Sequence, residues 1–211
     1  MKTHIILLNI SKITEGGIIM KKNMLPAALS NRHIHLTEED IEILFGRDYD
    51  LVKLRDLSQP GQYACEEKID LVGPKGTIKG VRVLGPARTK TQVEISLADG
   101  FTLGIVPPVK DSGDVTGSPG IKIVGPKGEL EIQEGLIAAA RHIHINPDDA
   151  EAFGVVDGQR VKVRTFGFRA LIFENVLIRL GDTSVLEMHV DIEEGNAAGL
   201  KNGDLVELIV D

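Results

Sequence analysis

The stretch Arg141-His142-Ile143-His144-Ile145-Asn146-Pro147-Asp148-Asp149-Ala150-Glu151-Ala152-Phe153-Gly154 contains the strand and helix that decide how this chain folds. Its His-Ile-His alternation predicts a strand, because side chains two residues apart lie on one face of an extended chain. Asn146 then predicts a helix N-cap, Pro147 takes the first helical position, and Gly154 ends the helix. The sequence therefore predicts a strand that presents two histidines and runs directly into a short helix.

The same unit occurs twice more in the chain. Gly199 follows His189 by ten residues, which is also the spacing between His144 and Gly154. A copy that is one residue longer follows His35. Acidic residues fill the first turn of each predicted helix, where the helix dipole favours them. We therefore expect short helices at residues 38–46, 147–153 and 192–199.

Most of the remaining chain is predicted to be strand. The 23 glycines suit many tight turns, and aromatic residues make up only 4%, which leaves a core of Ile, Val and Leu. The predicted strands cover residues 26–35, 69–72, 77–84, 91–97, 101–106, 120–124, 128–133, 136–145, 160–165, 168–179, 184–190 and 204–210. Many short strands with few helices are typical of β-barrels, so the expected fold class is mainly β.

A second repeat, Gly-Pro-Lys-Gly, occurs at residues 73–76 and 125–128. An apolar strand is predicted on each side of both copies, so the pattern indicates hairpin turns. A phosphate-binding role for the two lysines is the alternative.

The placement of the histidines predicts a metal site. Four of the six histidines lie in two copies of one tetrapeptide, Arg32–His35 and Arg141–His144, and His189 lies in another strand-like segment. Two imidazoles on one strand face can close on one ion, and zinc binds histidine nitrogens at about 2.0–2.1 Å. Hydrogen-bonded core histidines are the alternative, but two copies of an identical frame favour a metal. Glu94 is the candidate carboxylate ligand, because an unpaired carboxylate is costly in an apolar strand.

Charge and composition limit the partners. The formal net charge of −7 argues against nucleic acid, since phosphate backbones are usually bound by a basic face. An acidic protein can still bind an anion locally, and Arg88 lies in the basic loop 86–90, where it could hold phosphate through two parallel hydrogen bonds. No segment predicts a membrane span, and residues 1–23 are interpreted as an N-terminal extension.

Cys65 is the single cysteine, so an internal disulfide is excluded and a reducing compartment fits. The neighbouring Glu66 and Glu67 are expected to raise the pKa of the thiol, which argues against a nucleophile.

A cupin fold with one metal ion is a rival hypothesis. His33, His35, Glu39 and Gly46 fit the first half of a cupin signature. However, residues 37–45 predict a capped helix where a cupin needs strand, and the second cupin motif is missing at the expected distance.

Four motifs resemble, in chain order, those of the phosphate propanoyltransferases, the phosphotransacylases of the propanediol-utilisation type. They are Ser30–Leu36, Gly85–Glu94, Ala140–His144 and Glu187–Asp191. The resemblance extends from about residue 24 to the end of the chain. It implies two β-barrels with short capping helices, in which the N-terminal strand completes the C-terminal barrel. Residues 24–31 and 140–211 are then expected in one barrel, and residues 32–139 in the other, with hairpin insertions.

The resemblance also implies a ligand set for each substrate and metal. The family's ligands for one zinc ion correspond to His33, His35 and Glu94, and those for a second zinc ion correspond to His142, His144 and His189. The phosphate-binding arginine of the family corresponds to Arg88, which is the expected catalytic residue. Contacts to coenzyme A fall on Ser30, Arg55, Arg82, Leu84, His189 and Asn196, with Arg55 standing where the family leads us to expect lysine.

The implied reaction converts propanoyl-CoA or acetyl-CoA and phosphate into acyl phosphate and CoA, reversibly. Direct attack of phosphate on the thioester is the mechanism we infer from these roles, because Ser30 has no evident base partner and Cys65 is expected to be inert. It implies small-molecule partners only, a homodimer, and a cytoplasmic enzyme, with the interior of a bacterial microcompartment for propanediol degradation as one setting. A binuclear zinc thioesterase, which would release acid without phosphate, is the main chemical alternative. A non-catalytic zinc protein is a further alternative, but three ligands per ion leave an open position, which is typical of catalytic zinc.

Overall fold

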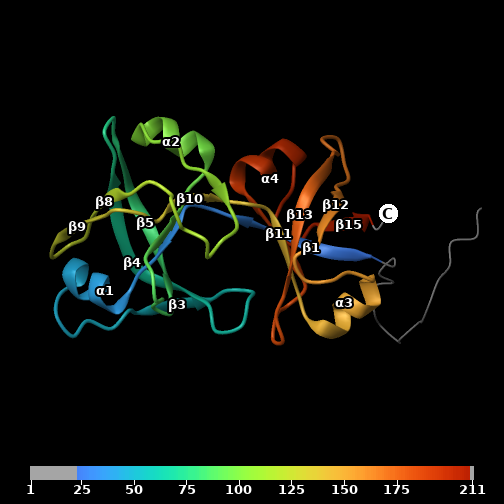
Figure 1. The fold of residues 1–211 in the computed structure, drawn as a ribbon, viewed down its shortest axis with the longest axis horizontal. Coiled ribbons are helices and arrows are strands. Elements are labelled where there is room, and N and C mark those ends of the chain that lie inside the picture. The colour runs from blue at the N-terminus through green and yellow to red at the C-terminus, as the bar shows by residue number, and fades with distance from the viewer. Residues whose placement is uncertain (1–22, 210–211) are drawn as a thin grey trace, which may run out of the picture.

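The computed structural model describes residues 23–209, which form fifteen strands and four helices. The strands make two sheets, which lie at opposite ends of the molecule in Figure 1. The helices have seven or eight residues each, and the prediction of a mainly β protein with short helices is confirmed. The extension expected at residues 1–23 lies outside the described residues, apart from Asn23. Within residues 23–209, the helices are all too short to cross a membrane.

Six strands form a closed barrel, drawn mainly in orange and red in Figure 1. In order around the barrel they are β1 (Met24–Ser30), β14 (Glu187–Asp191), β11 (His142–Ile145), β13 (Ile172–Leu180), β12 (Arg160–Arg164) and β15 (Leu205–Ile209). β1 runs parallel to β14 and antiparallel to β15. Its Leu25 and Ala27 are fully buried in the barrel core. The N-terminal strand therefore completes the C-terminal barrel, as predicted.

The other nine strands form a second sheet, a half-barrel around its own core of aliphatic residues. Its path is β7 (Val109–Lys110), β10 (Leu136–Ala139), β6 (Gln92–Glu94), β2 (His33–His35), β5 (Thr77–Gly85), β4 (Tyr63–Val72), β8 (Ile121–Val124) and β9 (Glu129–Ile132), with β3 (Lys53–Asp56) paired to β4. β3, β7 and the first half of β4 were not predicted.

The chain passes between the two sheets at residues 31–32 and 140–141. β1 ends at Ser30 and β2 begins at His33, while β10 ends at Ala139 and β11 begins at His142. The segments 26–35 and 136–145, each predicted as one strand, are thus two strands in different sheets. Both His-x-His pairs come immediately after a crossing, which places them where the sheets meet.

The three predicted helices are confirmed to within one residue. They are α1 (Glu38–Phe45), α3 (Pro147–Phe153) and α4 (Ile192–Ala198). Each begins with a side chain that accepts a backbone hydrogen bond from the third helical residue, and these N-caps are Thr37, Asn146 and Asp191. Buried apolar residues on each helix then cover one sheet.

A fourth helix, α2 (Leu97–Leu103), corrects the strand predicted at residues 101–106. Ser96 and Asp99 form a reciprocal capping box that starts the helix, and Gly104 ends it in the left-handed conformation. These local signals outweigh the apolar run that suggested a strand.

The two Gly-Pro-Lys-Gly segments are hairpin turns, as predicted, and each rests against the C-terminal end of a helix. Lys75 N–H donates to Leu103 O of α2, and Lys127 N–H donates to Leu44 O of α1, both at 3.0 Å. A Cβ atom added to Gly125 would lie 2.5 Å from Leu44 O. The turns therefore satisfy helix carbonyls, and the lysines do not line the cavity described below.

Candidate metal centres and active site

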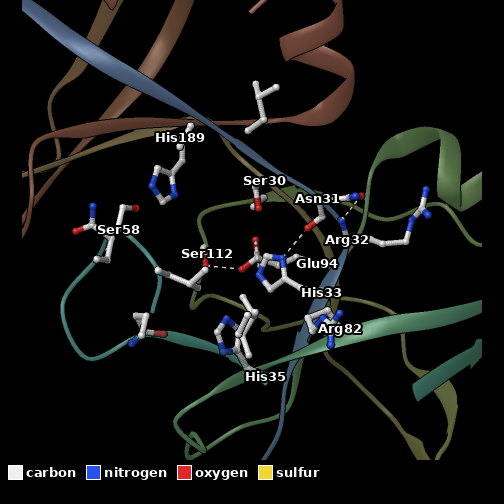
Figure 2. A pocket seen from close by; sticks show the side chains of 18 of the residues that line it. Ser30, Asn31, Arg32, His33, His35, Ser58, Arg82, Glu94, Ser112 and His189 are labelled. Atoms are coloured by element: carbon white, nitrogen blue, oxygen red, sulfur yellow. Dashed lines mark hydrogen bonds and ion pairs between the residues drawn. The ribbon is translucent and has the colours of Figure 1, made fainter. Parts of the chain in front are cut away.

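A cavity of about 1000 Å³ lies between the sheets and is lined by residues of both. Its walls include every predicted metal ligand, namely His33, His35, Glu94, His142, His144 and His189. Figure 2 shows Glu94 beside His33 on the half-barrel side, with His189 on the barrel side. The two predicted ligand triads are thus brought into one cavity.

The first triad is built by the pairing of two short strands. β2 and β6 are antiparallel with His33 opposite Glu94, and Glu94 Oε2 lies 3.6 Å from His33 Nε2. His33 Nδ1 donates to Asn31 O at 2.8 Å, so the proton is on Nδ1 and Nε2 faces the carboxylate. His35 is also buried, and the ligand atoms of all three residues lie within 4.8 Å of one another.

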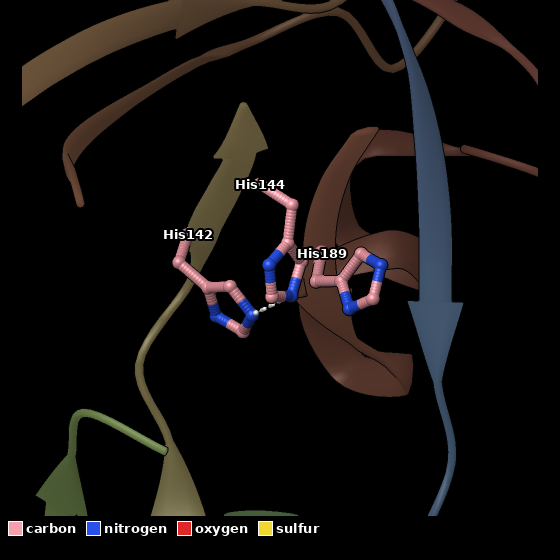
Figure 3. Close-up of side chains that lie close together, drawn as sticks. All are labelled: His142, His144 and His189. Carbon is pink, nitrogen blue, oxygen red and sulfur yellow. Dashed lines mark hydrogen bonds between the residues drawn. The ribbon is translucent and has the colours of Figure 1, made fainter. Parts of the chain in front are cut away.

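The second triad repeats this arrangement in the barrel. β11 and β14 are antiparallel with His142 opposite His189, and His142 Nδ1 donates to Ala140 O at 2.9 Å. The three rings converge in Figure 3, where the Nε2 atoms of His142 and His144 lie 3.2 Å apart. Two nitrogens bound to one tetrahedral zinc ion are separated by roughly 3.3 Å. The spacing of these nitrogens therefore fits a shared zinc ion.

Burial sets the protonation of the triads. It lowers the pKa of His35 and His144 to about 3 and that of His142 to about 4, and neighbouring histidines lower these pKa values further. Burial alone would raise the pKa of Glu94, but the attraction of His33 holds it well below its usual range. Burial likewise opposes protonation of His33, yet Glu94 leaves the His33 pKa raised. Neutral imidazoles and an ionised carboxylate are the forms that bind metal ions, so the donor sets fit once His33 gives up the proton that Glu94 stabilises.

A spacing rule relates the ligands to the helices. Glu94 lies two residues before Ser96, the N-cap of α2, and ten residues before Gly104, which ends that helix. The same two-residue spacing separates the N-caps of α1, α3 and α4 from His35, His144 and His189. α2 is therefore a fourth copy of the repeated unit, with glutamate in place of histidine. Gly104 is the sequence signal that could have revealed it.

The arginine of each repeated tetrapeptide, which sequence reasoning left without a role, holds a helix. Arg32 Nη2 lies 2.7 Å from Asp99 Oδ1, and Arg32 Nε donates to Asp99 Oδ2 at 2.9 Å. Arg141 Nη1 lies 2.9 Å from Glu194 Oε1. Asp99 and Glu194 are the capping-box acids of α2 and α4, the helices that follow Glu94 and His189. Each arginine thus links the strand carrying two ligands to the helix beside the third.

Polar residues from two strands and two loops support the triads, and sequence reasoning missed these residues too. Ser112 Oγ donates to Glu94 Oε1 at 2.7 Å, a contact drawn in Figure 2, and Gln92 Nε2 donates to the same oxygen. On the barrel side, His189 Nε2 lies 2.7 Å from Glu187 Oε2, which also accepts a hydrogen bond from Ser58. Ser58 belongs to the half-barrel, so this bond crosses the cavity. Partners of this kind orient metal ligands.

The remaining predicted residues also lie at this cavity, with one exception. Arg88 lines it with a half-buried side chain, and its Nη2 donates to Gln62 Oε1 at 3.4 Å. Also among the lining residues are Ser30, Arg55, Arg82, Leu84 and His189. Asn196 is exposed on α4 and is not one of them. Arg88 therefore lies where it can share a small anion with the triads.

Cys65 is fully buried in the half-barrel core. Burial, followed by the charge of Glu67, raises the pKa of its thiol to about 11. This agrees with the expectation of an unreactive cysteine.

Fold and site together define a class of protein: a closed β-barrel and a half-barrel whose shared cavity carries two candidate three-ligand metal sites and an arginine. The family model of phosphate propanoyltransferase matches residues 26–201. A phosphate propanoyltransferase of Thermotoga maritima is 54% identical over 196 residues, which are 92% of this chain and 90% of the relative. One of Clostridioides difficile is 49% identical over 191 residues, 90% of this chain and 91% of the relative. The chain belongs to the phosphate propanoyltransferase family and is an acyltransferase.

Proposed function

We propose that this enzyme transfers the propanoyl or acetyl group between CoA and phosphate at a centre of two zinc ions. The observation that carries the proposal is the convergence of two ligand triads and Arg88 on one cavity. One ion would be held by His33, His35 and Glu94, and the other by His142, His144 and His189. Zinc ions held there would supply Lewis acidity, which polarises a thioester carbonyl and favours a thiolate leaving group.

The protein's part in the reaction is to position phosphate. Arg88 holds the anion against the thioester through paired hydrogen bonds. A phosphate oxygen then bonds to the carbonyl carbon, the carbon–sulfur bond breaks, and the electron pair leaves on the CoA sulfur. Phosphate at neutral pH is already nucleophilic, so positioning matters more than deprotonation.

Direct attack is favoured over an acyl-enzyme because neither of the two nucleophiles considered from the sequence, Ser30 and Cys65, is activated. Ser30 lines the cavity, but within residues 23–209 no basic side chain contacts its hydroxyl. Cys65 is buried in the core, is not one of the lining residues and has a raised pKa. The proposed reaction therefore runs through a complex that holds both substrates at once.

The CoA contacts proposed on Ser30, Arg55, Arg82, Leu84, His189 and Asn196 belong to the same scheme. We also propose that one barrel consists of residues 24–31 and 140–211 and the other of residues 32–139. The enzyme is proposed to be a homodimer located in the cytoplasm or in a microcompartment. Arg55, Lys68, Lys79 and Arg82 give one side of the cavity a basic lining, which suits the phosphates of CoA.

Thiol release from propanoyl-CoA and acetyl-CoA tests the proposal, measured with and without phosphate on zinc-loaded and chelator-treated protein. We expect release to need both phosphate and metal, and comparison of the two acyl groups ranks them. Metal-dependent release without phosphate would instead establish the thioesterase alternative. Tightly held zinc with no release in any condition would favour a structural role for the metal.

A further inference from the structure

Arg179 is an arginine of the cavity wall that nothing in the fold engages. It lies on β13 and lines the cavity with a half-buried side chain. Within residues 23–209, its guanidinium makes no hydrogen bond and no ion pair. A partly desolvated charge without a partner is unfavourable, so such a residue commonly awaits a ligand.

The strand register places Arg179 beside the second metal triad. β13 runs parallel to β11, with Arg179 opposite His144 and Ile178 opposite the core residue Ile143. Because side chains alternate along a strand, Arg179 lies on the face that carries the histidines. Its charge is close enough to lower the pKa values of His142 and His144, as well as that of Arg88 across the cavity.

An arginine on the equivalent strand of the half-barrel gives a useful contrast. Arg82 lies on β5, which runs parallel to β2, opposite His33. Its Nη1 donates to Cys65 O at 2.7 Å and to Glu66 O at 3.0 Å, so part of its hydrogen-bonding capacity is used by the fold. Arg179 keeps all of its donors for a ligand.

The carboxylates of the cavity do not supply the missing partner. Glu94 is engaged by His33 and Ser112, and Glu187 by His189 and Ser58. The other two lining carboxylates are also engaged, Asp56 by Lys53 and Asp191 by the Glu194 N–H. In addition to Arg55 and Arg82, Arg88 therefore places a guanidinium charge on the half-barrel side of the cavity and Arg179 places one on the barrel side. Two facing cations suit a small dianion that lies between them.

We propose that Arg179 is a second phosphate-binding residue, which grips the anion from the barrel side while Arg88 grips it from the half-barrel side. This inference rests on the proposed function. A phosphate held from both sheets would be aligned relative to both metal triads, and it would favour the two sheets staying together around the bound substrates.

Calorimetric titration of inorganic phosphate into the zinc-loaded full-length protein tests the inference without relying on turnover. Arg179→Ala is expected to weaken phosphate binding and to raise the KM for phosphate by about 10- to 100-fold, the usual loss for a charge-assisted hydrogen bond. The KM for propanoyl-CoA should change by no more than about twofold. Arg179→Lys keeps the charge without the planar fork, so it should give a smaller loss.

Arg164→Ala is the matched control, because Arg164 lies on the same barrel and pairs with Glu207 away from the cavity. Phosphate affinity of Arg179→Ala equal to that of this control would overturn the inference. So would a loss that falls equally on propanoyl-CoA, or an Arg179→Lys protein that folds normally yet binds phosphate no better than Arg179→Ala. If the wild type cleaves no thioester, the proposed function fails, while the titration still decides whether Arg179 binds phosphate.

Discussion

Arg32 and Asp99 are joined by an ion pair of 2.7 Å and a hydrogen bond of 2.9 Å, which bring two distant parts of the chain together. Arg32 directly precedes the strand with His33 and His35, and Asp99 lies in the helix that begins just after Glu94. The pair is thus a brace across the first triad. Arg141 and Glu194 brace the second triad in the same way.

Removal of one brace should loosen one metal centre and spare the other. We expect Arg32→Ala to weaken metal binding by His33, His35 and Glu94 by about 10- to 100-fold, the usual effect of losing a residue that orients ligands. Zinc release to a chromogenic chelator is expected in two phases, one for each site. Arg32→Ala should accelerate one of these phases relative to the wild type, and Arg141→Ala should accelerate the other. Arg47→Ala, at an exposed site, is the control. Equal acceleration of both phases by either variant would mean general destabilisation instead.

Stability of the metal-free protein should fall below neutral pH. The folded pKa values of His35 and His142, about 3 and 4, lie below the unfolded value of 6.5. The unfolded chain therefore binds more protons between those limits, and stability is lost as pH falls from 6.5 toward 4. Each ring should contribute about 2 kcal/mol between pH 6.5 and 5. The raised pKa of His33 acts in the opposite direction and offsets part of this loss.

Urea unfolding of chelator-treated protein at pH 7 and pH 5 measures this dependence. A His142→Gln variant should lose less stability than the wild type on acidification. An unchanged midpoint of wild-type unfolding across the two pH values would contradict the prediction.

The thiol of Cys65 should be inert in the folded protein. Because burial raises its pKa to about 11, very little thiolate exists at pH 8, and the side chain is also inaccessible. We expect iodoacetamide to label it only after unfolding in urea, as mass spectrometry would report. Cys65→Ala should keep phosphate-dependent thiol release within about threefold of wild type; loss of all activity in a folded variant would point to a cysteine nucleophile.

Gly125 should tolerate no side chain. A Cβ atom there meets the backbone oxygen of Leu44, which the neighbouring Lys127 N–H needs as an acceptor. Gly125→Ala is expected to lower the free energy of unfolding by about 1–3 kcal/mol, measured in urea. Gly158→Ala, which has open space but a positive φ of 75°, should cost only about 1 kcal/mol. Equal costs for the two variants would show that the contact with α1 is unimportant.

Local chemistry in the sequence was sufficient to predict much of this fold. N-caps such as Asn146 and stops such as Gly154 act within a few residues of themselves, so the three helices were predicted almost to the residue. α2 has the same signals in Ser96 and Gly104, and it was missed because Glu94 replaces the histidine that marks the other copies. β3 was missed because its four residues are exposed, so no apolar alternation marks it.

The sequence alone also determined which residues could bind metal, since a His-x-His strand presents both rings on one face whatever surrounds it. The family resemblance implied how they are grouped, and tertiary structure brings the members of each group together. Strand pairing sets His33 opposite Glu94 and His142 opposite His189, and pairing depends on contacts between segments tens of residues apart. Tertiary structure also decided that Ser58, Ser112 and Arg179 lie at the cavity. The local sequence around a polar residue in a loop or on a strand face does not indicate that the folded chain will place it there.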